Sequence, residues 1–174
     1  MVVTELRWAL VDCLHCDTDF ETRSAALVDK YNLDDVATSE PPPSSVTAGV
    51  DARDMELLSR IRRFDTAPLG LTLAGPAYRD NPILYSNETL RDFTGYPLDE
   101  LRGENPRLFQ GPDTEREPLN RLHEAVDTWT EVTVELWNYR RDGSRFRNRL
   151  TIVPVPDDSG MIANWLGIQA VIDR

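Results

Sequence analysis

The chain has 174 residues, of which 40% are hydrophobic and 28% are charged, and its formal net charge is −11. This length suits one globular domain of about 100–150 residues with an appended segment. The negative charge argues against bulk attraction to nucleic acid or an anionic membrane, and no stretch approaches the roughly 20 apolar residues of a membrane-spanning helix.

The basic residues are almost all arginine, since Lys30 is the only lysine among 19 basic residues. An acidic, lysine-poor chain resembles proteins of extremely salt-rich cytoplasms, which indicates a haloarchaeal source. Two cysteines cannot form the framework of a disulfide-stabilised domain, and the N-terminus lacks the basic and apolar stretches of a signal peptide. We therefore expect a cytoplasmic protein.

Those cysteines, Cys13 and Cys16, flank His15 in a segment whose residue types can bind metals. A zinc site usually needs four ligands, and His123 is the only other histidine. We therefore expect no metal and interpret these residues as small helix residues, with a redox role as the lesser alternative.

Residues 1–50 form an acidic N-terminal extension with 9 acidic and 3 basic residues. Leucines spaced four apart predict a helix over residues 4–16, and an apolar cluster predicts another over 21–31. The stretch 39–45 contains three consecutive prolines and favours an extended linker.

A linker helix follows within residues 51–66. Met55, Leu58 and Ile61 fall on one stripe at helical spacing, which predicts a helix over residues 51–64. Two interpretations stay open at this point. The helix packs on its own domain, or it serves as a dimerisation or signalling helix.

Residues 67–174 carry the pattern of one α+β domain. Two strands, two helical regions and three strands are predicted in that order. The first two strands cover residues 69–73 and 81–85, and the two helical regions cover residues 88–103 and 115–126. Turn sequences at residues 142–143 and 157–160 join the last three strands. This order predicts an antiparallel five-stranded sheet with helices on one face, to which the N-terminal helical extension is added.

Three carboxamide residues fall on the inward faces of the last three strands. Period two places Asn138, Asn148 and Gln169 among apolar neighbours there. A buried amide without a partner costs about 1–3 kcal/mol. Loop backbone most simply satisfies one such residue, whereas three aimed at one cavity favour a flat polar ligand, because amides donate and accept. The edge of a flavin ring, with its N–H, carbonyls and N5, has this need.

The strongest local motif spans Gly103–Thr114, and with five further segments it resembles the light-oxygen-voltage (LOV) family of flavin-binding PAS domains. Those segments are Asp80–Tyr85, Phe93–Tyr96, Glu135–Gly143, Phe146–Leu150 and Leu166–Gln169. The resemblance covers residues 68–174 and implies a PAS fold with a bound flavin. It favours FMN over FAD or riboflavin, since the chain lacks the loop insertion of members that take FAD.

The resemblance also assigns roles to single positions. Polar flavin contacts are implied for Asn105, Gln110, Asn138, Asn148 and Gln169, and the walls of the ring pocket for Leu119, Leu136, Leu150 and Trp165. Gln169 matches the glutamine that senses N5 of the ring. Arg107 matches an arginine that holds the cofactor phosphate, a role suited to a planar, permanent charge. The second phosphate arginine of the family aligns with His123, so His123 or Arg121 is expected there.

Pro106 stands where the family has its adduct-forming cysteine. Without a thiol, the usual cysteinyl–flavin bond cannot form at this position. The resemblance therefore implies a blue-light receptor that signals through photoreduction of the flavin to the neutral semiquinone and rearrangement of Gln169. The electron donor stays open among Trp129, Trp137, Trp165 and Tyr139.

Two other functions fit the same residues. One is a light-independent redox or oxygen sensor that uses the same flavin, and the other is a dimerisation module with an empty pocket. We expect no enzyme, because no acid–base pair or nucleophile set accompanies the pocket residues.

The second face of the last strand is also apolar and carries Leu166, Ile168, Ala170 and Ile172. An uncovered apolar face indicates a partner, so we expect it to pack against an N-terminal helix or a second subunit. The predicted assembly is a homodimer through this outer face and the N-terminal helices. The downstream signalling protein stays unidentified, and neither nucleic acid nor membrane is expected as a partner.

Overall fold

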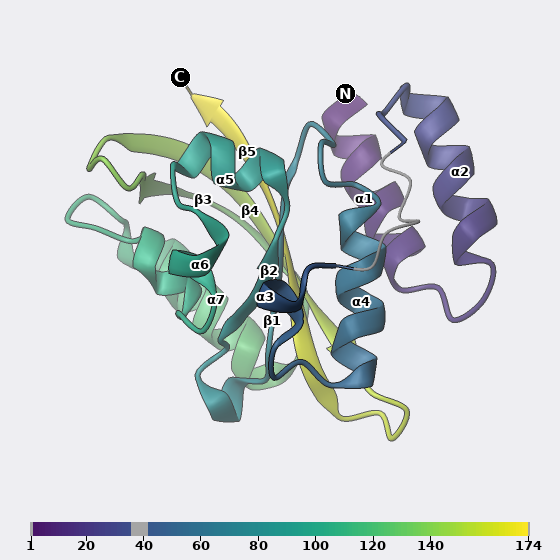
Figure 1. Ribbon diagram of the computed structural model, residues 1–174. Helices are drawn as coiled ribbons and strands as arrows, with labels where there is room; N and C mark the ends of the chain where they lie inside the picture. Colours follow the sequence, from purple (N-terminus) through teal and green to yellow (C-terminus); the bar gives the residue numbers. More distant parts are fainter. Residues whose placement is uncertain (1, 36–41, 174) are drawn as a thin grey trace.

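The computed structural model describes residues 2–35 and 42–173, and its centre is one five-stranded sheet (Figure 1). The strands are β1 (Gly70–Ala74), β2 (Ile83–Ser86), β3 (Val132–Tyr139), β4 (Arg145–Pro156) and β5 (Ile162–Asp173). Neighbouring strands are antiparallel, in the order β2-β1-β5-β4-β3. The predicted α+β fold and its element order are confirmed.

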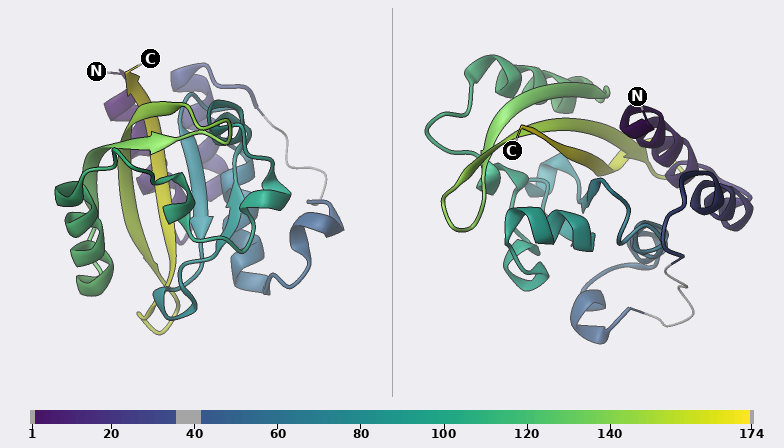
Figure 2. Two further views of the ribbon diagram at one scale, coloured as in Figure 1. Left: turned by 90° about the vertical axis from the view of Figure 1, so that its left-hand side faces the viewer. Right: turned by 90° about the horizontal axis from the view of Figure 1, so that it is seen from above.

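Helices lie on both sides of this sheet. The N-terminal ones are α1 (Val2–Leu14), α2 (Phe20–Tyr31), α3 (Ser44–Thr47) and α4 (Ala52–Arg62), and those within the domain are η1 (Ala77–Arg79), α5 (Glu88–Thr94), α6 (Leu98–Leu101), η2 (Pro106–Phe109) and α7 (Arg116–Thr128). In Figure 1, α1 and α4 lie on one side of β5, and α5 to α7 lie on the other. Figure 2 shows that α1 begins and β5 ends at the same end of the sheet. Among the helices so described, none has the length and hydropathy to cross a bilayer.

The helical region expected over residues 88–103 is two short helices. Gly95 ends α5 with a φ of 76°, a left-handed conformation that glycine adopts without strain. Pro97 then stands immediately before α6, where the fixed φ of proline is tolerated. The linker expected over residues 39–45 lies partly outside the described residues, and its last two residues begin α3.

The face of the sheet that carries Leu166 and Ile168, here called the outer face, is covered by α1 and α4. The predicted leucine stripe of α1, which is Leu6, Leu10 and Leu14, is at most 4% exposed and packs in one cluster with both β5 residues. The expectation that an N-terminal helix or a second subunit covers this face is confirmed for the helix at Leu166, Ile168 and Ala170, whereas Ile172 near the end of β5 is 38% exposed.

Arg7 of α1 and His15, which directly follows α1, have buried nitrogen atoms without hydrogen-bond partners. Arg7 is 3% exposed, and its Nε and Nη2 atoms make no hydrogen bond. Burial lowers the pKa of Arg7, and the nearby charge of Arg149 lowers it further. The Nε2 atom of His15 is also buried without a partner. Apolar contacts therefore hold α1 in place against an electrostatic cost.

His15 should make the stability of the fold depend on pH. Burial lowers its pKa, so the unfolded chain binds a proton at a higher pH than the folded chain does. The stabilising contribution is complete above the unfolded pKa of about 6.5 and is lost as the pH falls through that value toward the folded pKa. In urea unfolding between about pH 7.5 and pH 5, the His15→Leu variant should therefore lose less stability than wild type. His123→Gln, at an exposed position, is the control, and equal slopes in both variants would contradict the assignment.

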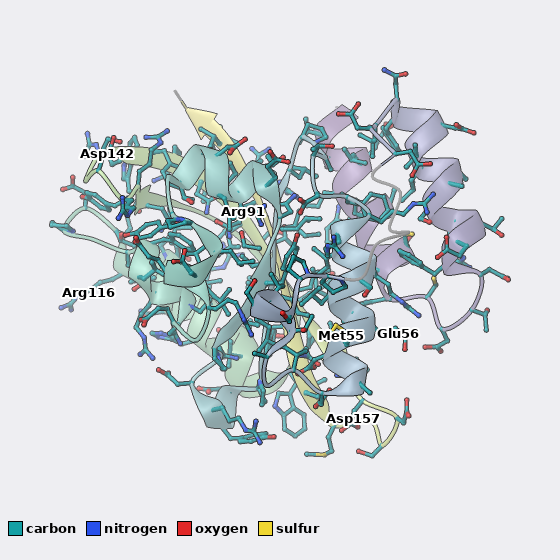
Figure 3. All side chains as sticks on the ribbon, viewed as in Figure 1. Met55, Glu56, Arg91, Arg116, Asp142 and Asp157 are labelled. Atoms are coloured by element: carbon teal, nitrogen blue, oxygen red, sulfur yellow. The ribbon has the colours of Figure 1, made fainter. Side chains whose placement is uncertain are left out.

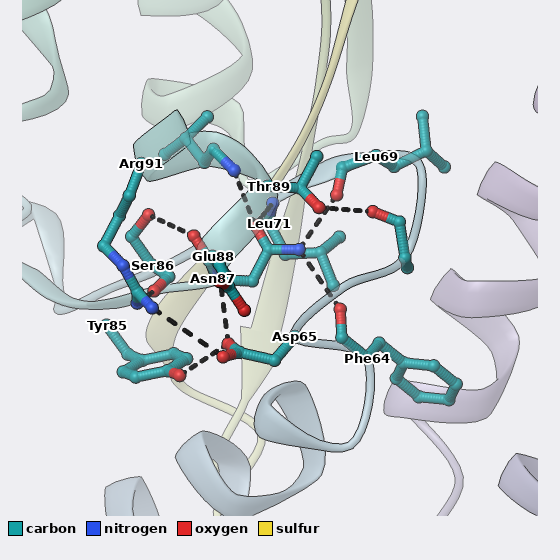
Figure 4. A network of polar contacts seen from close by, with 12 residues as sticks. Phe64, Asp65, Leu69, Leu71, Tyr85, Ser86, Asn87, Glu88, Thr89 and Arg91 are labelled. Atoms are coloured by element: carbon teal, nitrogen blue, oxygen red, sulfur yellow. Dashed lines mark hydrogen bonds and ion pairs between the residues drawn. The ribbon is translucent and has the colours of Figure 1, made fainter. Parts of the chain in front are cut away.

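Asn87 fixes the connection between α4 and β1 (Figure 4). Its side chain is fully buried and uses every hydrogen-bonding position. Nδ2 donates to the carbonyl oxygens of Phe64 (3.1 Å) and Leu69 (2.9 Å), and Oδ1 accepts from the amides of Leu71 (2.7 Å) and Leu90 (3.1 Å). One side chain thus joins the end of the linker helix segment to β1 and α5.

Asp65 makes a second set of contacts at this junction. It accepts hydrogen bonds from the Tyr85 hydroxyl (2.7 Å) and the Glu88 amide (3.2 Å), and it lies 3.7 Å from Arg91. Burial, followed by the bond to Asp65, raises the pKa of Tyr85, so the phenol stays a donor. The linker helix is therefore held to β2 and α5 as well as to the outer face.

Candidate functional site

The three inward carboxamides meet on the face of the sheet opposite the outer face, here called the inner face. Asn138, Asn148 and Gln169 are 4%, 0% and 3% exposed. The Nδ2 atom of Asn148 donates to Asn138 Oδ1 (2.8 Å) and to Gln169 Oε1 (2.9 Å). The inward orientation expected from period two is confirmed, and the three residues form one hydrogen-bonded row across β3, β4 and β5.

This row is incomplete at its centre. The Oδ1 atom of Asn148 is buried and accepts no hydrogen bond. Asn138 Nδ2 donates to the carbonyl of the adjacent Trp137 (3.2 Å) and so does not fill this position. An orphaned buried acceptor costs about 1–3 kcal/mol, which a ligand N–H would recover. The three carboxamides, with one acceptor still unpaired, therefore fit the polar edge of a flat ring such as that of a flavin.

The four apolar residues expected to line the ring pocket are buried to different degrees. Leu136 is 1% exposed and Trp165 is 5% exposed, while Leu119 and Leu150 are half-buried. Gly167 lies between Trp165 and Gln169 on the same face of β5, and a Cβ there would come within 2.3 Å of the Thr72 hydroxyl oxygen. Because Gly167 has no side chain, nothing projects from the inner face at this position of β5.

The turn from Asn105 to Gln110 is organised around η2. Asn105 caps this helix, because its Oδ1 accepts from the Arg107 amide (2.8 Å). Its Nδ2 donates to the Asp80 carbonyl (2.7 Å) and to the Asp80 carboxylate (3.2 Å). Gln110 is half-buried at the end of η2. The structure thus turns Asn105 toward Asp80 rather than toward the three sheet carboxamides.

The three residues expected near a phosphate lie on η2 and α7, and two of them already contact other protein groups. Arg107 is exposed and forms an ion pair with Asp80. Arg121 donates to the Thr133 carbonyl of β3 (3.2 Å) and lies 4.0 Å from Glu117. His123 is exposed on α7. A phosphate bound here would take Arg107 from Asp80, whereas Arg121 protects the open edge of β3.

Two residues that contribute to this region, Thr72 and Asp80, are not predicted from the sequence. Thr72 is 4% exposed and pairs with Gly167, which places it on the inner face two residues from Gln169 along the sheet, while Gly70 pairs with Gln169 itself. In the sequence, the only indication of this role is that Thr72 is a polar residue between two leucines of a predicted strand. Asp80, which holds both Asn105 and Arg107, adopts a left-handed conformation with a φ of 65°. An aspartate in a turn gives no indication of partners about 25 residues away.

A separate cleft lies between the end of α5 and the β3–β4 turn. Its volume is about 390 Å³, and its lining includes Phe93, Thr94, Arg140 and Arg141. Both arginines are engaged, since Arg140 donates to the Phe93 carbonyl and Arg141 pairs with Glu100. Arg116, at the start of α7, points outward at the periphery (Figure 3). Within residues 2–35 and 42–173, no cluster of three His, Cys, Asp or Glu side chains could hold a metal ion.

Comparison with known proteins gives a consistent result. The family described as PAS domain matches residues 72–170. A solved structure titled "Flavin Analogue Sheds Light on Light-Oxygen-Voltage Domain Mechanism" is 34% identical, with a TM-score of 0.62, and the match covers 67% of this chain and 86% of that one. The LOV domain from the Erythrobacter litoralis EL346 blue-light activated histidine kinase is 33% identical, with a TM-score of 0.58, covering 62% of this chain and 98% of that one.

Curated relatives extend the match. The bacterioopsin transcriptional activator of Halobacterium salinarum is 32% identical over 149 residues, which is 86% of this chain and 22% of that protein. A match of this length reaches into the N-terminal helices. The blue-light photoreceptor of Listeria monocytogenes is 35% identical over 109 residues, or 63% of this chain and 43% of that protein. This chain therefore spans less than half the length of each of these two relatives.

Proposed function

Because this chain belongs to the light-oxygen-voltage group of PAS domains, we propose that it is a flavin-binding blue-light receptor that signals without a bond between flavin and cysteine. The observation that carries the proposal is the row Asn138–Asn148–Gln169 with its orphaned central acceptor. A bound flavin would supply absorption of blue light and the capacity to take up an electron and a proton. The composition and the Halobacterium relative support a haloarchaeal source.

Gln169 is the residue through which a change at the ring would reach the rest of the protein. Its Oε1 accepts from Asn148, so turning its amide end for end would break that bond and place an N–H against an N–H. The preceding residue of β5, Ile168, faces the other way and is fully buried under α1. A shift of β5 driven at Gln169 would therefore disturb the packing of α1.

The two cysteines support the adduct-free part of the proposal. Pro106 is the first residue of η2 and has no thiol. Cys13 lies in the outer-face cluster, on the other side of the sheet from Gln169, and Cys16 follows the end of α1. Burial, and then the neighbouring Cys16, raises the pKa of Cys13 to about 11, which keeps this thiol protonated and unreactive.

The test is an absorption spectrum of the purified protein in darkness and after blue light. We expect a yellow protein whose oxidised-flavin absorption falls on illumination and recovers in the dark. A colourless protein that takes up no added flavin would overturn the proposal. The redox alternative predicts the spectral change with a chemical reductant in darkness and no additional change with light.

Substitution of Pro106 tests the role of this position. Pro106→Cys places a thiol at the start of η2, and we expect a second photoproduct that a thiol-blocking reagent prevents. Pro106→Ala is the matched control, because it removes the same ring and supplies no sulfur. A sulfur-dependent photoproduct in wild type or in Pro106→Ala would refute adduct-free signalling.

We further propose FMN as the flavin, with Arg107 released from Asp80 to hold the phosphate. Reconstitution of the flavin-free protein with FMN, FAD and riboflavin tests this choice, and equal affinities would contradict it. The proposed assembly is a homodimer, and because α1 and α4 cover the outer face in this structure, the contact would be made through these N-terminal helices. One solved relative is a light-state dimer of the fungal photoreceptor Vivid. Light scattering in darkness and under illumination measures this association.

A further inference from the structure

The aromatic residues that could give an electron to a flavin lie in different environments. Trp165 is 5% exposed and shares the inner face of β5 with Gly167 and Gln169. Trp165 and Gln169 are four residues apart along β5, so their Cα atoms are about 13 Å apart. Because Gly167 has no side chain, nothing from β5 separates the Trp165 indole from the Gln169 position. This tryptophan therefore borders the proposed flavin site from within the same strand.

Trp137 has the opposite environment. By the alternation of β3 it lies on the outer face, and two guanidinium groups cover its ring, with Arg145 Cζ 4.4 Å and Arg147 Cζ 5.6 Å from the ring centroid. Removing an electron from an indole leaves a positive charge on it. Each of the two guanidinium groups is paired with a carboxylate, Arg145 with Asp113 and Arg147 with Glu115, so their charges are partly offset. Trp137 is disfavoured as the donor chiefly because it lies on the outer face, across the sheet from Gln169.

The other two aromatic residues are also disfavoured. Trp129 is 56% exposed at the end of α7, in a left-handed conformation with a φ of 56°. The Tyr139 hydroxyl oxygen accepts a hydrogen bond from the Asp113 amide (3.0 Å), which withdraws electron density from the phenol. Its ring packs against Gly111, where a Cβ would come within 2.4 Å of it. Neither residue combines burial with a place on the inner face.

We propose that Trp165 is the electron donor to the light-excited flavin, an inference that rests on the proposed function. The indole ring of Trp165 loses one electron, and the flavin gains it. The proton that follows the electron to the flavin comes from the indole N–H or from water. In the dark the electron returns to the tryptophan radical, or a thiol in solution donates a hydrogen atom to that radical and leaves the flavin reduced.

Trp165→Phe tests the proposal while keeping a buried aromatic ring. In the presence of a thiol such as dithiothreitol, we expect the rate of photoreduction to fall about tenfold or more. Flavin fluorescence should rise, because electron transfer from a nearby indole quenches it. Trp137→Phe and Trp129→Phe are the matched controls and should behave as wild type.

A second measurement uses the unmodified protein and does not depend on the folding of a variant. Cleavage after arginine places Trp165 in the peptide 150–174 and both Trp129 and Trp137 in the peptide 122–140. Illumination in air without a reductant should oxidise the first peptide at Trp165, located by fragmentation because Met161 shares that peptide. Oxidation confined to the second peptide would overturn the proposal.

The outcomes separate this inference from the proposed function. If the Trp165→Phe variant binds flavin and photoreduces it as fast as wild type does, Trp165 is removed as donor and the receptor function still stands. A wild-type protein that binds no flavin overturns both. If the flavin fluoresces less strongly in Trp165→Tyr than in Trp165→Phe, the donor role is supported, since tyrosine is oxidisable and phenylalanine is not.

Discussion

Asn87→Ala should lower the free energy of unfolding by about 3–5 kcal/mol. The side chain is fully buried and makes four hydrogen bonds to main-chain groups of three segments. Alanine would leave the carbonyls of Phe64 and Leu69 and the amides of Leu71 and Leu90 without these partners. Water cannot reach all four positions, so much of the desolvation cost persists in the folded variant.

Urea unfolding followed by circular dichroism measures this effect. Asn120→Ala is the matched control, because Asn120 is exposed on α7 and should change stability by no more than about 0.5 kcal/mol. If Asn87→Ala were as mild as Asn120→Ala, the junction between α4 and β1 would not depend on this side chain. The linker helix would then be attached mainly through its apolar contacts.

The inner face shows how much of the site the sequence could predict. Strand periodicity is local, so it correctly placed Asn138, Asn148 and Gln169 on one side of the sheet. The same rule placed Leu166 and Ile168 on the other side, where α1 covers them. Contact of these carboxamides with a flavin stays a prediction, because it depends on a molecule outside the chain.

The polar contacts between distant segments could not be predicted in this way. Asn87 begins a short helix, and any asparagine there would be interpreted as a cap; its bonds to Phe64 and Leu69 require the folded junction. Asp80 stands out in the sequence only as part of a motif, yet it holds Arg107 and Asn105. Such partners are set by tertiary packing, which local periodicity does not encode.

Arg7 is the clearest case of a residue whose burial could not be predicted. In helical projection it lies at the margin of the leucine stripe, where an arginine usually extends to solvent. Here it is 3% exposed, and its Nε and Nη2 atoms have no hydrogen-bond partner. Burial and the charge of Arg149 lower the pKa of Arg7, and the charge of Glu135 offsets only part of this effect. A buried charge with this environment opposes the docking of α1.

Arg7→Met should therefore raise the free energy of unfolding by about 1–4 kcal/mol, an unusual direction for a buried substitution. Methionine has a similar length and adapts to irregular spaces, so it keeps the packing and removes a buried charge that is only partly compensated. Equilibrium unfolding in urea measures the change, and protease resistance of α1 should increase with it.

The same substitution at Arg60 is the control, and it should change the free energy of unfolding in the opposite direction. Arg60 donates to the carbonyls of Leu14 (3.2 Å) and Cys16 (2.6 Å) and pairs with Glu56 (2.7 Å), so Arg60→Met should lower stability by about 1–3 kcal/mol. Loss of stability in both variants would show that Arg7 contributes favourable contacts. A gain at position 7 alone would identify Arg7 as the residue that keeps α1 weakly attached to the strand that carries Gln169.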